Sequence, residues 1–86
     1  MKSIHDQSYK LLISLLREER RKQKLTQAEL AERIDSDQTY VSKVETMERR
    51  IDVIELRTFC KALDIDLLNF LKDFEDRLKD SLEEKR

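Results

Sequence analysis

The 86-residue sequence contains no glycine and no proline, and it has only one cysteine and one histidine. Collagen-like chains, glycine linkers and other low-complexity chains rich in glycine or proline are therefore excluded. Walker-type and dinucleotide-binding loops are excluded as well, because their glycines let the backbone approach a phosphate closely. The longest uninterrupted apolar run is three residues, 11–13. Since roughly 20 apolar residues are needed to cross a bilayer, no membrane span is predicted.

Cys60 and His5 are too few, and too far apart in the sequence, to form a Cys/His catalytic pair or a zinc site within one chain. A lone cysteine cannot form an internal disulfide, and the first residues lack the apolar stretch and cleavage site of a secretory leader. We therefore expect a cytoplasmic protein with no catalytic residue, no metal and no cofactor. The pattern favours binding over catalysis.

Charged residues make up 43% of the sequence and apolar residues 38%, and the apolar residues recur at helical spacing. With no glycine or proline to mark boundaries, helix starts are identified from capping residues. Thr26 with Glu29 and Asp52 with Glu55 form two capping boxes, and Asp66 can cap a last helix. The sequence predicts a single all-α domain over residues 1–86, with helices near residues 8–23, 26–34, 38–46, 52–63 and 66–82.

The second and third predicted helices are short, and the turn-favouring residues 35–37 (DSD) separate them. The third has only two aliphatic residues, Val41 and Val44, so most of its surface is polar. Two helices joined in this way over residues 26–46 predict a helix-turn-helix, whose second helix enters the DNA major groove. The polar side chains that would reach base edges there are Gln38, Thr39, Ser42 and Lys43.

Three segments resemble the Cro and phage-repressor (XRE) helix-turn-helix family: residues 25–31 (LTQAELA), residues 38–45 (QTYVSKVE), and Arg49 with Arg50. They occur in the family's order and spacing, and the resemblance extends from about residue 12 to residue 71. It implies a five-helix, lambda-repressor-like DNA-binding domain that binds a two-fold symmetric double-stranded DNA operator as a dimer.

The resemblance implies a role for individual residues. It places Gln38, Thr39, Ser42 and Lys43 at base-reading positions, and Gln38 is the first candidate because a glutamine amide can bond adenine N6 and N7 together. It implies an ion pair between Arg20 and Glu45 that locks the third helix against the first. It implies a phosphate contact for Gln27. Phosphate contacts are also predicted for Tyr40, Arg49 and Arg50, each with an alternative. Packing is an equal alternative for Tyr40, as internal salt bridges are for the two arginines.

The sequence departs from the family pattern at its turns. The family usually has glycine where this chain has Lys24, Asp35, Met47 and Asp64, and often proline near Ile51. A left-handed backbone costs Lys or Met roughly 1–2 kcal/mol, whereas Asp tolerates it better. These turns therefore either take another shape or accept the strain.

The overall charge is not that of a strongly basic DNA-binding domain, since the net charge is −1 and the pI about 5.9. The distribution of charge along the chain agrees better with DNA binding. Residues 1–50 contain eleven Lys/Arg and nine Asp/Glu, whereas residues 51–86 contain seven and ten. Because affinity depends on the cations that reach phosphates, we expect few phosphate contacts per subunit and reliance on dimeric binding.

The C-terminal helix carries an apolar stripe that starts at Leu67 and Leu71 and continues to Leu82, with successive spacings of four, three, four and four residues. The stripe extends beyond what five short helices can cover. We expect it to form a dimer contact, the alternative being that the helix folds back over its own domain. The predicted interface residues are Phe74, Leu78 and Leu82.

Together these observations predict a cytoplasmic, dimeric, sequence-specific DNA-binding transcriptional regulator, in the form of a repressor, with no enzymatic activity and no membrane partner. Antitoxins and restriction-modification controllers share this plan and act through a further protein partner. A rival interpretation is a protein–protein interaction module that keeps the fold without binding DNA, favoured by the acidic pI and the missing turn glycines.

Overall fold

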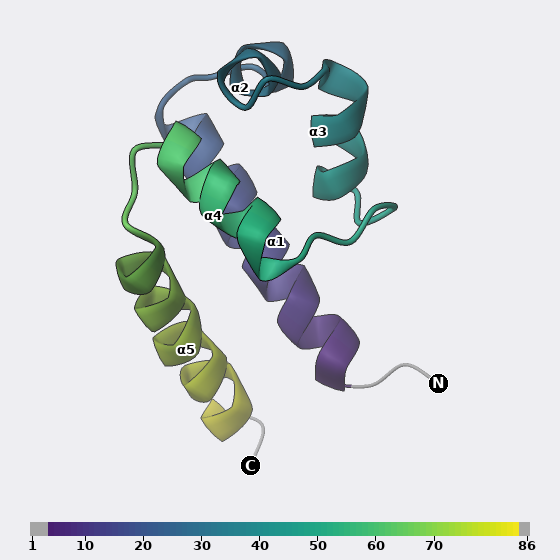
Figure 1. The fold of residues 1–86 in the computed structure, drawn as a ribbon. Coiled ribbons are helices and arrows are strands. Elements are labelled where there is room, and N and C mark those ends of the chain that lie inside the picture. The colour runs from purple at the N-terminus through teal and green to yellow at the C-terminus, as the bar shows by residue number, and fades with distance from the viewer. Residues whose placement is uncertain (1–3, 85–86) are drawn as a thin grey trace.

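The computed structural model describes the backbone of residues 4–84 and the side chains of residues 7–81. Within that range the chain forms five helices and no strand, which confirms the all-α fold expected from the sequence. The helices are α1 (Ile4–Lys22), α2 (Gln27–Arg33), α3 (Gln38–Glu45), α4 (Val53–Ala62) and α5 (Leu67–Glu84). In Figure 1, α2 and α3 form the end of the molecule away from both termini, and α5 extends back toward the N-terminal end of α1.

The helix starts are fixed by local side-chain hydrogen bonds. At α2, Thr26 Oγ1 accepts from the Glu29 amide at 3.0 Å and the Glu29 carboxylate accepts from the Thr26 amide at 2.8 Å. Asp52 and Glu55 repeat this reciprocal arrangement at α4, with distances of 2.8 and 3.0 Å. Asp37 caps α3 by accepting from the backbone of the third residue after it, at 2.9 Å. Both predicted capping boxes are confirmed.

Each of the first four helices is followed by a residue in the left-handed backbone region. Lys24, Asp35, Met47 and Asp64 have φ of 59°, 60°, 67° and 59°, each two residues beyond its helix. After three of them, the next amide donates to the carbonyl five residues earlier, which satisfies an end carbonyl. The turns therefore keep the shape that usually requires glycine, and the chain accepts the strain at Lys24 and Met47.

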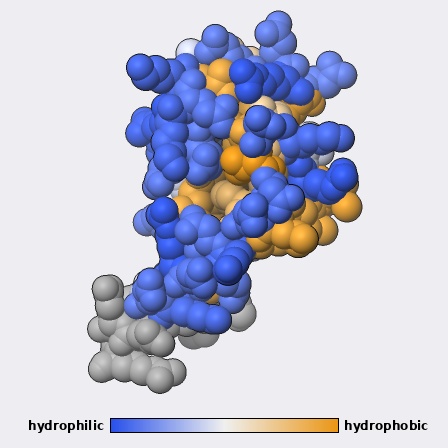
Figure 2. All heavy atoms as spheres, turned by 90° about the vertical axis from the view of Figure 1, so that its left-hand side faces the viewer, coloured by the Kyte–Doolittle hydropathy of each residue, from blue (hydrophilic) through white to orange (hydrophobic). Residues whose placement is uncertain are grey.

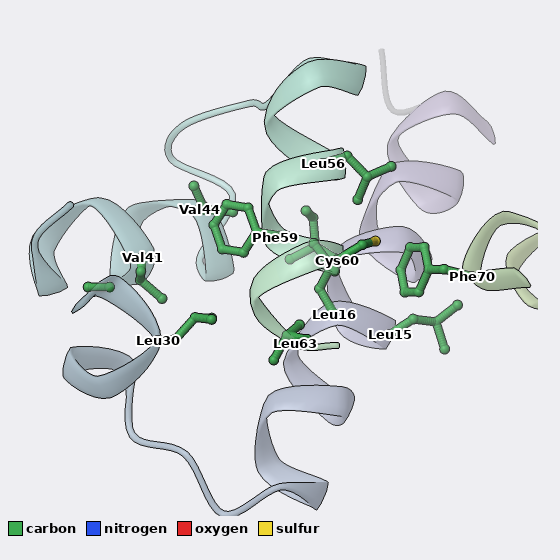
Figure 3. Packing of buried hydrophobic residues seen from close by; sticks show 12 residues of the cluster. Leu15, Leu16, Leu30, Val41, Val44, Leu56, Phe59, Cys60, Leu63 and Phe70 are labelled. Carbon is green, nitrogen blue, oxygen red and sulfur yellow. The ribbon is translucent and has the colours of Figure 1, made fainter. Parts of the chain in front are cut away.

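The core lies where α1, α2, α3, α4 and the start of α5 converge (Figure 3). Phe59 projects from α4 toward Val44 of α3, Leu63 lies near Leu16 of α1, and Phe70 of α5 lies beside Leu15. Cys60 is 1% exposed within this cluster. The buried apolar side chains are Ile13, Leu15, Leu16, Leu30, Ala31, Val41, Val44, Leu56, Phe59, Cys60, Leu63 and Phe70.

The first helix is longer than predicted. It begins at Ile4 rather than near Ser8, since no proline or glycine interrupts it there.

The last helix packs against both α1 and α4, so that Phe70 is buried and Phe74 lies partly against the core. Arg77 Nη2 lies 3.7 Å from Glu18 Oε1, and this ion pair links α5 to α1. Leu82 lies outside the described side chains.

The apolar surface of α5 is wider than the part that its own domain covers. Phe70, at one edge of it, is buried, whereas Leu68, at the other edge, is 74% exposed. Leu71 and Leu78, which lie between them around the helix, are half-buried. Over residues 4–84, no helix is both long and apolar enough to cross a membrane.

Candidate nucleic-acid interface

The outer side of α3 is polar, and its inner side anchors it to the domain. Val41 and Val44 are 0% and 1% exposed. These two side chains are the fully buried part of the helix, and the opposite side stays at the surface. Of the four predicted base-reading residues, three are exposed and Ser42 is half-buried, and all four share one side of α3. They are Gln38, Thr39, Ser42 and Lys43.

An ion pair fixes the C-terminal end of α3 against α1. Arg20 Nε donates to Glu45 Oε2 at 2.7 Å and Arg20 Nη2 donates to Oε1 at 2.9 Å, the bidentate geometry of strong charge-assisted bonds. Arg20 Nη1 also donates to the Leu25 carbonyl at 2.6 Å. The two charged side chains are only 9% and 5% exposed. The pair that the family resemblance implied is therefore present and shielded from water.

Arg17 is a further charged residue at this site that the sequence did not single out. Its Nε lies 4.0 Å from Glu45 Oε1, and its side chain is 49% exposed. The signal for it was its spacing: Arg17 precedes Arg20 by three residues on a helix, which places both on one side of α1.

The environment of Glu45 favours its ionised form. Burial by itself would raise the pKa of Glu45, but hydrogen bonds from Arg20 and Gln27 and the charges of Arg20 and Arg17 outweigh it. The net effect is a pKa below the ordinary value. Glu45 is therefore a carboxylate, and a carboxylate can only accept hydrogen bonds.

Two glutamines connect Glu45 to the outer side of α3. Gln27 Nε2 donates to Glu45 Oε1 at 3.0 Å, and Gln38 Nε2 donates to Gln27 Oε1 at 3.2 Å. Gln27, the first residue of α2, thus lies between the buried ion pair and the predicted base-reading residue. The sequence did not predict this contact, because it depends on how α2 and α3 pack.

Tyr40 is half-buried and packs against the core. Its hydroxyl donates to Glu55 Oε2 at 3.0 Å, and its ring centroid lies 6.0 Å from that of Phe59. Burial, together with the hydrogen bond to Glu55, raises the pKa of Tyr40 to about 12. The packing alternative for this residue is thus the one that the geometry favours.

Arg49 and Arg50, in the connection between α3 and α4, each lie against a tyrosine ring of a helix. The guanidinium of Arg49 is 5.0 Å from the Tyr40 ring centroid, and its Nη2 donates to Glu55 at 2.9 Å. The Arg50 guanidinium is 4.1 Å from the Tyr9 ring centroid. The Tyr9 hydroxyl in turn accepts from the Ile51 amide at 3.1 Å. These contacts tie the connection to α1 and α4 while both arginines remain exposed.

The remaining reactive groups among the described side chains do not form a metal site. Among the side chains of residues 7–81, no group of three or more His, Cys, Asp or Glu is arranged to hold a metal ion. Burial raises the pKa of Cys60 to about 11, with smaller contributions from Asp66 and Glu19. The thiol is therefore a protonated core side chain.

Comparisons with known proteins agree with this geometry. The helix-turn-helix family model matches residues 16–70, more than half of the chain. The solved structure of an XRE-family like protein from Pseudomonas syringae pv. tomato str. DC3000 is similar to this chain, with 42% sequence identity and a TM-score of 0.82. The similarity covers 86% of this chain and 90% of that one. The curated proteins searched gave no match. An exposed polar helix held by an arginine–glutamate pair, together with these similarities, shows that the chain belongs to the XRE-type helix-turn-helix family of DNA-binding regulators.

Proposed function

We propose that this protein is a cytoplasmic, sequence-specific transcriptional regulator that binds an inverted-repeat operator as a dimer and represses by occupying it. The observation that carries the proposal is the exposed polar side of α3, which is anchored from behind by Val41, Val44 and the Arg20–Glu45 pair. A helix anchored in this way can enter the major groove without losing its orientation.

The proposed contacts divide into base edges and phosphates. Base edges are assigned to Gln38, Thr39, Ser42 and Lys43. Arg49 and Arg50 are assigned to phosphates, since both are exposed. A guanidinium that stacks on a tyrosine ring still has in-plane N–H donors available for a phosphate.

Two residues have modified assignments. Gln27 uses one N–H on Glu45 and its oxygen on Gln38, so its second N–H is the group proposed to reach a phosphate. The Tyr40 hydroxyl donates its hydrogen bond to Glu55, and we propose that Tyr40 supports the ring-stacked Arg49 instead of contacting DNA itself.

The dimer is proposed to form through the uncovered apolar surface of α5. Leu68 is 74% exposed, and Leu71 and Leu78 are half-buried, so the stripe continues past the part that α1 and α4 cover. Figure 2, which views the side from which α5 projects, shows apolar atoms extending from the middle of this side to its edge. A second copy of the chain would cover an equivalent stripe, as a two-fold dimer requires. The domain of residues 1–86 is proposed to act as one unit in this dimer.

Selection of bound duplexes from a random library tests the proposal. The full chain should recover an inverted repeat whose half-sites lie about 34 Å apart, one helical turn. Affinity for the recovered site should fall steeply as salt increases, because phosphate contacts release counterions. Gln38→Ala should reduce discrimination between bases at one position of each half-site. Failure to enrich any sequence would contradict the proposal.

The second candidate is a protein-binding module of the same fold. It is favoured by the net charge of −1 and by the exposed acidic residues Asp35 and Asp37, directly before α3. Such a module would show weak DNA affinity that does not depend on sequence. The salt dependence and the library selection therefore separate the two candidates.

A further inference from the structure

Arg50 is the less committed of the two arginines in the connection between α3 and α4. Arg49 donates from Nη2 to Glu55 at 2.9 Å and from Nη1 to the Arg50 carbonyl at 3.1 Å. The guanidinium of Arg50 is exposed, and it donates to no group of the described part of the chain. Arg50 can therefore offer two parallel N–H donors to an anionic oxygen, whereas Arg49 already uses a donor on each of its terminal nitrogens.

Tyr9 holds the guanidinium of Arg50 in place. The guanidinium carbon is 4.1 Å from the centroid of the Tyr9 ring, and Tyr9 is half-buried on α1 with its side chain packed against the core. The ring attracts the cation and covers one face of the planar group, while the in-plane N–H donors stay accessible. A long side chain that would otherwise sample many rotamers is thus restricted before any partner binds.

The hydroxyl of the same tyrosine holds the backbone next to Arg50. The Ile51 amide donates to Tyr9 Oη at 3.1 Å, across 42 residues of sequence. The chain has no proline that could fix φ in this connection, so the shape of the connection depends on noncovalent contacts of this kind. One side chain of α1 thereby constrains both the guanidinium of Arg50 and the backbone that follows it.

We propose that Tyr9 is a positioning residue that presents Arg50 to a phosphate of the bound DNA. This role rests on the proposed function and deepens it, because it identifies which arginine of the connection has its donors available and which residue orders it. The connection directly follows α3, the helix proposed to enter the major groove. A phosphate contact there would fix how the domain sits on the duplex.

The order that Tyr9 imposes should be measurable as DNA affinity. Immobilising a free, rotamer-rich side chain on binding weakens an association by roughly two- to twelvefold, and a side chain that is already ordered avoids most of that loss. Without the ring, Arg50 can still reach the phosphate but must be ordered as it binds. We therefore expect Tyr9→Leu to lower operator affinity about fivefold per subunit and to leave the salt dependence nearly unchanged.

Arg50→Ala should behave differently, because it removes the phosphate contact itself. The slope of log affinity against log salt should decrease in magnitude by about one per subunit.

A double-mutant cycle measures the coupling between the two residues. The full chain and the operator recovered from the random library are used, and dissociation constants are measured by fluorescence anisotropy at several salt concentrations. The proteins are the wild type, Tyr9→Leu, Arg50→Ala and the double variant. Tyr9→Leu should weaken binding about fivefold per subunit when Arg50 is present and should weaken it no further when position 50 is alanine.

Two further variants make the outcome specific. Arg49→Ala is the matched control background, since Arg49 lies over Tyr40 rather than Tyr9, and the effect of Tyr9→Leu should persist in it. Tyr9→Phe keeps the ring beneath Arg50 and removes only the hydroxyl, so it should lose less affinity than Tyr9→Leu. Circular dichroism verifies that each variant is folded, and Tyr9→Met replaces Tyr9→Leu if the latter is not.

The outcomes separate this role of Tyr9 from the proposed function. A wild-type protein that selects no operator overturns both. If the wild type binds its operator but Tyr9→Leu weakens binding equally with arginine or alanine at position 50, Tyr9 stabilises the fold without presenting Arg50, and the positioning role alone is wrong. The same conclusion follows if Arg50→Ala leaves affinity and salt slope at their wild-type values, or if Tyr9→Phe loses as much affinity as Tyr9→Leu.

Discussion

At the scale of single residues, Glu45 serves both the stability of the fold and the orientation of the proposed DNA-binding surface. Its carboxylate accepts from Arg20 and Gln27 while its side chain is only 5% exposed. Removing one member of a buried pair leaves the other charge uncompensated and typically costs about 3–5 kcal/mol. Substitutions at Glu45 therefore change stability and DNA binding together, whereas Gln27 offers access to DNA binding alone.

The lowered pKa of Glu45 predicts acid sensitivity of the fold. A carboxyl whose folded pKa is depressed contributes its full stability above the ordinary value, about 4.5 here, and loses that contribution as pH falls through the folded pKa. The difference in free energy of unfolding between the wild type and Glu45→Gln should therefore shrink as pH is lowered from about 6 to 3. Urea unfolding at several pH values measures it. A difference that stays constant across this range would contradict the predicted linkage.

Whether a residue's role could be predicted from the sequence depended on how far away its partner lies. The capping pair Thr26 and Glu29 is three residues apart, so local rules sufficed. The pair Arg20 and Glu45 is 25 residues apart, and only the family resemblance supplied it. The contacts of Gln27 with Gln38 and of Arg50 with Tyr9 depend on how helices pack, which no local pattern encodes.

At the scale of secondary-structure elements, the helix ends are the unusual feature of this chain. Four residues with side chains occupy the left-handed positions where glycine is usual, and three of the four turns nonetheless close in the standard way. The sequence identified these four positions through the family pattern but left their conformation open. The reason is energetic: a penalty of roughly 1–2 kcal/mol at Lys or Met is small enough for tertiary packing to override.

The strain at Lys24 predicts that glycine there stabilises the protein. Lys24→Gly should raise the free energy of unfolding by about 0.5–1 kcal/mol, because relief of the left-handed penalty exceeds the greater chain entropy of glycine. Met47→Gly should behave similarly, and Asp64→Gly less so, since Asp tolerates positive φ better. Thermal and urea unfolding measure the effect.

Lys72→Gly is the matched control for these variants. Lys72 is exposed within α5, where glycine should destabilise by about 1 kcal/mol. A decrease in stability for Lys24→Gly as well would show that the lysine is not strained in the folded protein.

At the scale of the whole molecule, α5 has to stabilise its own domain and still leave apolar surface for a partner. Phe70 and Phe74 face the domain, and Arg77 reaches Glu18 on α1. This part of α5 folds back over its own domain, as in the predicted alternative to a dimer contact. Leu68 and Leu78 remain at least partly uncovered, and they are the part we assign to the dimer.

The proposed dimer predicts a mass of about twice 10.4 kDa by light scattering at micromolar concentration. Leu68→Glu and Leu78→Glu should each shift the mass toward that of the single chain, because a charge would be buried in the interface. Asn69→Glu, at an exposed neighbour of Leu68, is the control and should leave the mass unchanged. Phe74→Glu is less informative, since Phe74 also packs on its own core. A monomeric wild type would exclude this dimer.

The bond between Gln38 and Gln27 also has a consequence for protein engineering. A recognition helix is often treated as a portable part that carries its base preference to a new scaffold. Here α3 supplies Gln38 and Glu45, but Gln27 belongs to α2 and Arg20 to α1. A graft of α3 alone would transfer the exposed side chains without the residues that orient them. The smallest transferable unit is therefore the pair α2 and α3, moved onto a host helix with an arginine at the position of Arg20.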